Sequence, residues 1–280
     1  MLVNAKQILN TAYKNKNVVF HININNLEWT KFVLLAAKET NKPIILGVSP
    51  SAAKYFGGYN VCYNLVSSLI QDLEIQTPVC LHLDHGNFDD CIKAIDANFP
   101  SVMFDGSKLP FEQNLALSKQ IYEICNKKNI SLECEIGRIG GVEDNVVSNV
   151  VYTKIEEALE FKKIGIDMLA VGIGNIHGEY PTDWKGINFD LLNQLNKKLK
   201  MPLVLHGGSG ISKDDIKKCT ELGIAKININ TELQIENAKA LEEFIKNNDI
   251  MNNKNYNPRN LYKKANESIF NKTKEILNQF

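Results

Sequence analysis

Three His-Gly dipeptides stand at the ends of short apolar runs in this chain of 280 residues: His85-Gly86, His177-Gly178 and His206-Gly207. The chain has only five histidines, so three in one context indicate a shared task. Three imidazoles at the exits of three strands, with a fourth position open, form the ligand set of a catalytic zinc site. We therefore predict that they hold Zn²⁺ as a Lewis acid. The alternative for any one of them is a hydrogen-bonded loop residue.

Acidic residues accompany these histidines. Asp84 directly precedes His85, where its carboxylate can carry a proton to or from a substrate; alternatively, it only orients a histidine ligand. Glu133 and Glu135 share one face of their strand, and Asp105 ends the strand before it. Buried carboxylates need a cation or hydrogen bonds. Asp105 and Glu135 could therefore hold a second cation, the alternative being an ion-pair network with lysines.

Two glycine-rich segments follow strands. His206-Gly-Gly-Ser-Gly210 leads to a helix capped by Ser212, and its N–H groups and the Ser209 hydroxyl can surround a phosphate. The segment 226–232 runs from the last strand into a helix, and its polar residues could bind the same ligand. Barrel enzymes frequently bind phosphate after strands seven and eight. The alternatives are a tight turn and ordinary helix caps.

A further segment rich in glycine, 137–145, follows the fifth strand and ends in acidic residues. Its composition predicts a mobile active-site loop. Glu143 on this loop is a candidate acid or base, or else a solvated carboxylate. Of the remaining histidines, His82 is interpreted as a second-sphere or core residue and His21 as structural.

The elements that must position these residues alternate between short apolar strands and helices. Strands are predicted at 18–23, 43–48, 78–84, 101–105, 131–136, 168–172, 203–206 and 226–230. Nearly continuous apolar strands indicate burial on both faces of a parallel sheet. Eight βα units in this length favour an α/β fold with a single (β/α)8 TIM barrel over residues 1–280. A doubly wound sheet is the competing fold, but it would gather ligands at one switch point.

Local signals mark the helix ends. Thr153-Lys-Ile-Glu156 has the pattern of a capping box, and Gly165 should end the helix that it opens. Ser212 and Gly223 should bound another helix. The segment 247–259 reads as an exposed loop before a last helix at 260–279, a C-terminal helical tail. Lys226 is placed at the start of its strand, away from the catalytic face.

Composition narrows the class of protein. Lys and Arg total 32, as do Asp and Glu, so the formal net charge is zero. This balance argues against a nucleic-acid or membrane-surface binder. No apolar stretch approaches the roughly 18 residues of a membrane span. The six cysteines show no Cys-x-x-Cys pairing and are expected to be buried, reduced thiols of a cytoplasmic protein.

Taken together, these motifs resemble the class II, metal-dependent fructose-bisphosphate aldolase family from about residue 4 to the end. The segments that carry the resemblance are Asn23-Ile-Asn-Asn-Leu-Glu28, Leu81-His-Leu-Asp-His-Gly86, Glu133-Cys-Glu-Ile-Gly137, Gly140-Gly-Val-Glu-Asp144, His177-Gly-Glu-Tyr180, Leu205-His-Gly-Gly-Ser-Gly210, Lys226-Ile-Asn-Ile-Asn-Thr-Glu232 and Tyr256-Asn-Pro-Arg259. Two places depart from the family pattern. Arg138 introduces a cation where the family often has Gly-Thr-Val-Gly-Gly or similar, and Gly106-Ser107 replaces the Ala-Ser of some relatives.

The resemblance implies a glycolytic lyase that cleaves fructose 1,6-bisphosphate reversibly into dihydroxyacetone phosphate and glyceraldehyde 3-phosphate. It implies zinc on His85, His177 and His206, a second cation on Asp105 and Glu135, and a monovalent cation. Asp84 would be the proton donor, and Glu143 matches a loop acid proposed to act on the dihydroxyacetone-phosphate carbon. The residues implied to bind dihydroxyacetone phosphate are Gly178, Gly207, Gly208, Ser209, Asn228, Ile229, Asn230 and Thr231.

Two further matches concern the other half of the substrate. Ser49 matches a residue that contacts glyceraldehyde 3-phosphate. Arg259 resembles the family arginine that reaches into a neighbouring subunit for the distal phosphate, which implies a homodimer or homotetramer. The alternatives are a tagatose-1,6-bisphosphate aldolase, a metal-dependent phosphosugar epimerase or isomerase, and a phosphosugar-binding protein without catalysis.

Overall fold

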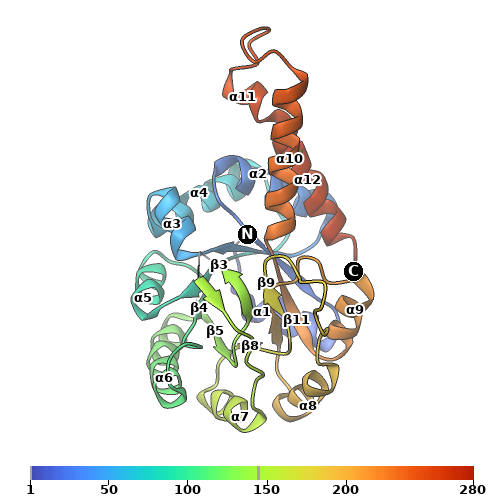
Figure 1. Cartoon of the computed structure of the whole chain (residues 1–280). Helices are drawn as coiled ribbons and strands as arrows, with labels where there is room; N and C mark the ends of the chain where they lie inside the picture. Colours follow the sequence, from blue (N-terminus) through green and yellow to red (C-terminus); the bar gives the residue numbers. More distant parts are fainter. Residues whose placement is uncertain (1, 144–145) are drawn as a thin grey trace.

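Eight parallel strands close into a barrel in the order β1-β11-β10-β8-β5-β4-β3-β2 (Figure 1). The structure is a computed structural model that describes residues 2–143 and 146–280, without the side chains of 142–148. The barrel strands are β1 Val19–Asn23, β2 Ile44–Val48, β3 Val79–Gly86, β4 Ser101–Phe104, β5 Ser131–Ile136, β8 Met168–Val171, β10 Leu203–Leu205 and β11 Ile224–Ile229. Each corresponds to a predicted strand, and the (β/α)8 prediction is confirmed.

Helices surround the barrel and follow most strands (Figure 1). The outer helices are α2 Leu27–Thr40, α3 Pro50–Phe56, α4 Tyr59–Asp72, α5 Phe88–Asp96, α6 Phe111–Lys128, α7 Ile155–Ile164, α8 Phe189–Leu199 and α9 Lys213–Glu221. Ser212 caps α9 by accepting a hydrogen bond from the Asp215 amide at 3.1 Å. Gly165 ends α7 at a positive φ, as predicted.

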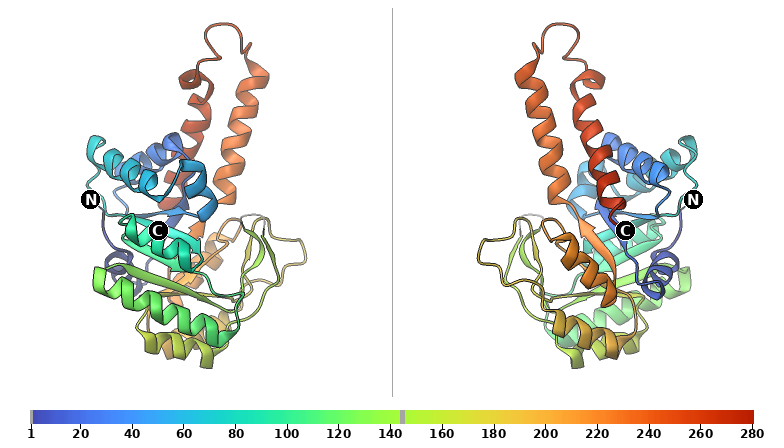
Figure 2. Two further views of the ribbon diagram at one scale, coloured as in Figure 1. Left: turned by 90° about the vertical axis from the view of Figure 1, so that its left-hand side faces the viewer. Right: turned by 90° about the vertical axis from the view of Figure 1, so that its right-hand side faces the viewer.

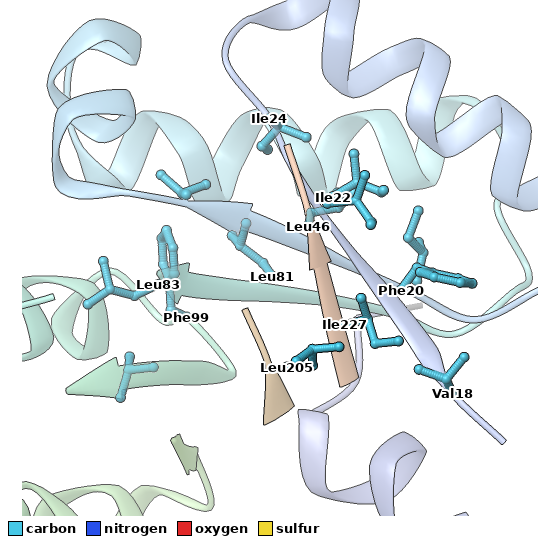
Figure 3. Packing of buried hydrophobic residues seen from close by; sticks show 14 of the residues in the cluster. Val18, Phe20, Ile22, Ile24, Leu46, Leu81, Leu83, Phe99, Leu205 and Ile227 are labelled. Carbon is cyan, nitrogen blue, oxygen red and sulfur yellow. The ribbon is translucent and has the colours of Figure 1, made fainter. Parts of the chain in front are cut away.

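Two apolar layers result from the alternation of side chains along each strand. The outward-facing residues, among them Phe20, Leu46, Leu81 and Ile227, pack against the helices (Figure 3). The inward-facing residues include Val19, Ile45, Cys80 and Met103, and they form a second cluster with α1. This helix, Ala5–Lys14, buries Ala5, Ile8, Leu9 and Ala12, so it closes the N-terminal end of the barrel. All six cysteines are buried and unpaired.

A small sheet of three strands, in the order β7-β6-β9, lies outside the barrel. Its strands are β6 Gly140–Glu143, β7 Val146–Ser148 and β9 Ile176–His177. The capping box predicted at Thr153 is wrong, because α7 has no side-chain cap. The Thr153 hydroxyl instead donates to the Ile136 carbonyl at 2.7 Å and accepts from the Gly172 amide at 2.9 Å. It therefore links the ends of β5 and β8.

A helical hairpin projects from the barrel, with α10 Thr231–Asn247 and α12 Lys263–Leu277 side by side (Figure 2). The short helix α11, Pro258–Leu261, lies near its outer end (Figure 1). The predicted loop at 247–259 is therefore the tip of a hairpin, and the last helix begins at Lys263. No helix in the described ranges is both long and apolar enough to cross a bilayer.

Candidate metal centre and active site

Two of the three histidines of the His-Gly pairs stand at the carboxyl ends of barrel strands. His85 lies near the end of β3 at a φ of +52°, a left-handed conformation that is uncommon for a side chain larger than glycine. His206 directly follows β10. The prediction that His177 ends the sixth barrel strand is wrong, because β8 ends at Val171 and His177 belongs to β9.

Gly207, the glycine after His206, leaves room for the strand β9, which carries His177 to the site. A Cβ atom on Gly207 would lie 1.9 Å from the Ile176 carbonyl oxygen, and Gly207 has a φ of +67°. Gly141 faces the His177 carbonyl in the same way, with a Cβ distance of 2.0 Å. These glycines therefore allow β9 to approach the barrel closely, which the sequence pattern alone does not show.

The three imidazoles converge at the mouth of the barrel. One nitrogen from each of His85, His177 and His206 lies within 4.8 Å of the others. His85 Nε2 is 2.9 Å from His206 Nδ1, a distance at which either a shared proton or a common metal ion separates the two lone pairs. His177 Nε2 is buried without a hydrogen-bond partner in the described structure. These features fit a divalent cation held at the roughly 2 Å bond lengths of zinc–imidazole sites.

Carboxylates fix which nitrogen of two histidines points to this centre. His85 Nδ1 lies 2.9 Å from Asp105 Oδ2, and His206 Nε2 lies 2.8 Å from Glu133 Oε1. A carboxylate accepts, so these ring nitrogens donate, and the opposite nitrogens face the centre. Burial, with the neighbouring His85, lowers the pKa values of His177 and His206 well below the usual range. Both are therefore neutral and suited to bind a metal.

The carboxylate of Asp84 lies beside the triad and is held by two amides. Asn23 Nδ2 donates to its Oδ2 at 2.9 Å and Asn228 Nδ2 donates to its Oδ1 at 3.2 Å. Burial alone would raise the pKa of Asp84, but nearby histidines, His21 foremost, lower it well below the usual range. Asp84 is therefore ionised, and the two amides fix the orientation of its carboxylate.

Asp105 and Glu135 share the Nδ1 side of His85 and meet no lysine in the described structure. The Glu135 Oε2 atom is 4.0 Å from His85 Nδ1 and has no hydrogen-bond partner there. Burial and the adjacent Asp105 charge raise the pKa of Glu135 to about 8. Oxygen atoms of both residues lie within 4.8 Å of a His85 nitrogen, so the group has the donors for a second cation.

The lysine network forms one layer deeper in the barrel, at Glu133. Lys226 Nζ donates to Glu133 Oε2 at 2.7 Å, and His82 Nε2 lies 3.4 Å from the same oxygen. All three side chains are completely buried. The prediction that Lys226 starts its strand is wrong, because β11 begins at Ile224 and Lys226 points into the barrel. His82 and His21 are interior residues, as expected.

A narrow cavity on one side of the triad contains most of the residues predicted to bind the first phosphate. Its lining includes Gly178, Gly207, Ser209, Asn228, Asn230 and Thr231. Ser209 Oγ accepts from the Asn230 amide at 3.3 Å, and the Asn230 side-chain oxygen is buried without a partner in the described structure. Gly208 and Ile229, also predicted to bind this phosphate, are not in the lining, and the Gly208 amide donates to the Asn228 carbonyl at 2.9 Å.

A larger cavity of about 400 Å³ opens on the other side of the triad. Pro50 and Ser51 line it, next to Ser49, whose hydroxyl caps α3 and contacts the Ser51 hydroxyl at 3.0 Å. Arg259 lies in the exposed helix α11 on the hairpin and lines neither cavity. Glu143 ends β6, and its side chain lies outside the described residues.

The sequence did not identify three residues that support the centre. Glu133 orients His206, Lys226 balances the Glu133 charge, and Asn23 holds Asp84. A signal existed for two of them. Glu133 shares its strand face with Glu135, and Asn23 is the last inward-facing residue of β1. The contact to Lys226 joins residues 93 positions apart and depends on barrel register.

Comparison with known proteins gives consistent matches over nearly the whole chain. The family model described as "Fructose-bisphosphate aldolase class-II" matches residues 3–280. The chain is 51% identical over 261 residues to the fructose-bisphosphate aldolase of Ureaplasma parvum, covering 93% of this chain and 90% of the relative. It is 50% identical over 271 residues to that of Mycoplasma genitalium, covering 96% and 94%.

Solved structures give the same result. The crystal structure of the YdjI aldolase from Escherichia coli K12 superposes with a TM-score of 0.84 at 28% identity. The match covers 100% of this chain and 97% of that chain. The likeness therefore includes the hairpin as well as the barrel.

The buried ion pair of Glu133 and Lys226 allows a test that separates stability from metal binding. Glu133→Gln should lower the free energy of unfolding by about 3 kcal/mol, because the buried Lys226 ammonium loses its carboxylate. Adding Lys226→Met should restore most of that loss, as measured by urea denaturation of the metal-free protein. Zinc affinity, measured by competition with a chromophoric chelator, should fall about 10- to 100-fold in both variants. Unchanged zinc affinity in the double variant would show that Glu133 does not support His206.

Proposed function

The chain belongs to the class II fructose-bisphosphate aldolase family, and we propose that it cleaves fructose 1,6-bisphosphate reversibly into dihydroxyacetone phosphate and glyceraldehyde 3-phosphate. One observation carries the proposal. The convergent imidazoles stand between two cavities, next to an ionised carboxylate. A substrate with a phosphate at each end can then place its central carbons at the metal position. The glycolytic role of this reaction and the six buried free thiols favour a cytoplasmic location.

We assign the metal ligands to His85, His177 and His206, and the metal to zinc. A bound zinc ion would act as a Lewis acid on the C2 carbonyl and stabilise negative charge as the C3–C4 bond breaks. Asp105 and Glu135 are assigned to a second cation, and their shared contact with His85 supports this. The unpartnered amide oxygens of Asn228 and Asn230 offer further oxygen donors on the phosphate side, where a monovalent cation could be bound.

The protein's own groups handle the protons. Asp84 accepts the proton of the C4 hydroxyl as C4 becomes the aldehyde carbon and the C3–C4 electron pair stays with C3. We assign the later protonation of C3 to Glu143. Asn23 and Asn228 keep Asp84 in place by hydrogen bonds to both oxygens. Amides and hydroxyls from the residues that line the narrow cavity, Gly178, Gly207, Ser209, Asn228, Asn230 and Thr231, hold the first phosphate, so the bond to be broken stays near the metal.

The reaction can be tested directly. Purified protein should release triose phosphates from fructose 1,6-bisphosphate, and a chelator should abolish this until zinc is added back. Borohydride with substrate should not inactivate the enzyme, because no Schiff-base lysine takes part. Tagatose 1,6-bisphosphate should be assayed in parallel to establish the preferred substrate. Covalent trapping by borohydride, or full activity of the metal-free protein, would contradict the assignment.

Asp84 offers a test of the proton-transfer step. Asp84→Asn keeps the size of the side chain and one of its two accepting oxygens but cannot accept the C4 hydroxyl proton, so kcat should fall about 10²- to 10⁴-fold. Zinc content, measured by atomic absorption, should remain at the wild-type level. A normal kcat would remove Asp84 from the chemistry, whereas lost zinc would assign it to orienting His85.

We propose a homodimer or homotetramer in which the hairpin reaches a neighbouring subunit. Arg259 lies in α11 and lines neither cavity of its own chain. Figure 2 shows how far the hairpin projects from the barrel. The hairpin also exposes apolar side chains, with Ile245 47%, Met251 76% and Tyr256 55% exposed. Large exposed apolar groups on one projection are typical of a protein interface.

Complementation between two defective variants tests this arrangement. Arg259→Gln should weaken activity because the distal phosphate loses a guanidinium, and Asp84→Asn should lack proton transfer. When the two chains are refolded together, half of random dimers are hybrids with one complete site of two, so about a quarter of wild-type activity should return. Refolding each variant alone is the control. Failure to recover activity, with hybrids demonstrated by mass spectrometry, would place Arg259 outside the neighbouring site.

A further inference from the structure

The two cavities that meet at His85 and His177 differ in charge. The narrow cavity is lined by glycines, amides and hydroxyls, with Asp84 and the histidines as its only titratable groups in the described lining. The larger cavity, in contrast, contains two cations, Lys108 and Arg138, together with the acidic residues Asp90, Asp105 and Glu135. Dipoles can bind the phosphate on the narrow side, whereas the larger side offers full positive charges.

The Arg138 side chain has unused hydrogen-bonding capacity. Its backbone is fixed by a β-bridge, with the Arg138 amide donating to the Val151 carbonyl at 2.8 Å and the Val151 amide donating back at 2.9 Å. The guanidinium has five N–H donors. Its Nη2 makes one long contact, 3.5 Å to the Ser107 carbonyl, and its Nε is buried without a partner in the described structure. A half-buried guanidinium with most of its N–H groups unpaired can bind an anionic acceptor that enters the cavity.

The carboxylates of the same cavity do not supply that acceptor. Asp105 is bound to His85 Nδ1 and to the Ser107 amide, while Asp90 accepts from Tyr59 and from the Asn87 amide. No carboxylate whose position the structure describes forms an ion pair with Arg138. Lys108, on the loop after β4, is exposed at the rim and is likewise unpaired there.

We propose that Arg138, assisted by Lys108, binds the distal phosphate of the ketose bisphosphate, on the half that leaves as the aldehyde. The inference rests on the proposed function. A guanidinium presents parallel N–H groups that match two phosphate oxygens, and Lys108 adds a point charge. The first phosphate occupies the narrow cavity, so the rest of the chain must pass the histidines into the cavity that holds Arg138. This contact comes from the same subunit and is additional to Arg259 of a neighbour.

The test compares two substrates that differ only in the distal phosphate. Arg138→Gln should lower kcat/KM for fructose 1,6-bisphosphate about 10- to 50-fold, mainly through KM, as expected for one charge-assisted contact. The effect on fructose 1-phosphate should be less than about threefold, by the same reasoning. Arg138→Lys should retain more activity on the bisphosphate than Arg138→Gln. Lys119→Gln, on the outer face of α6, makes the same charge change away from the cavity and should affect neither substrate.

The outcomes separate this inference from the proposed function. Equal loss on both substrates, or no loss on either, would overturn the role of Arg138. Fructose 1-phosphate activity and zinc content show that a variant is folded, so a misfolded protein cannot pass as a positive result. If the wild-type enzyme cleaved neither fructose 1,6-bisphosphate nor tagatose 1,6-bisphosphate in the presence of zinc, the proposed function itself would be overturned.

Discussion

The buried carboxylate of Glu133 links the interior of the barrel to the histidines at its mouth. Glu133 accepts from His206 with one oxygen and from Lys226 with the other. The first contact turns the Nδ1 lone pair of His206 toward the other imidazoles, and the second keeps the carboxylate charged where water cannot reach it. Either charge alone would be costly at this depth, so each requires the other. The metal centre therefore depends on residues that no ligand touches.

The layering of the barrel explains why this pair can exist. The lowest layer is apolar and is closed by α1, and the outer faces of the strands pack against the surrounding helices. The middle layer, with His82, Glu133 and Lys226, is polar but internally paired. The top layer carries Asp84 and the triad. Polarity thus increases toward the mouth, where His85 adopts a left-handed backbone conformation with a φ of +52°.

Sequence patterns predicted the strands and two of the three histidine positions because both depend on local signals. Eight apolar runs end in polar residues, and parallel strands bring such ends to one face. His177 was expected at a strand end, but it reaches the site from the extra strand β9. The position of β9 depends on the close approach of its backbone to Gly141 and Gly207, which are distant from it in sequence. Likewise, Thr153 has a capping pattern but bonds to two strand ends. Tertiary partners overrode the local preference in each case.

His85 and His177 separate two cavities whose linings suit different parts of the proposed substrate. A phosphate held by N–H dipoles and hydroxyls stays fixed without lowering the pKa of nearby groups as strongly as a full positive charge would. The narrow cavity adjoins Asp84, the proposed proton acceptor, so uncharged donors are the suitable choice there. In the proposed reaction the larger cavity would instead attract and release an anionic aldehyde. Lys108 at the rim and the half-buried Arg138 would serve that purpose, because the attraction of a full charge reaches further than that of a dipole and is weakened by water and salt.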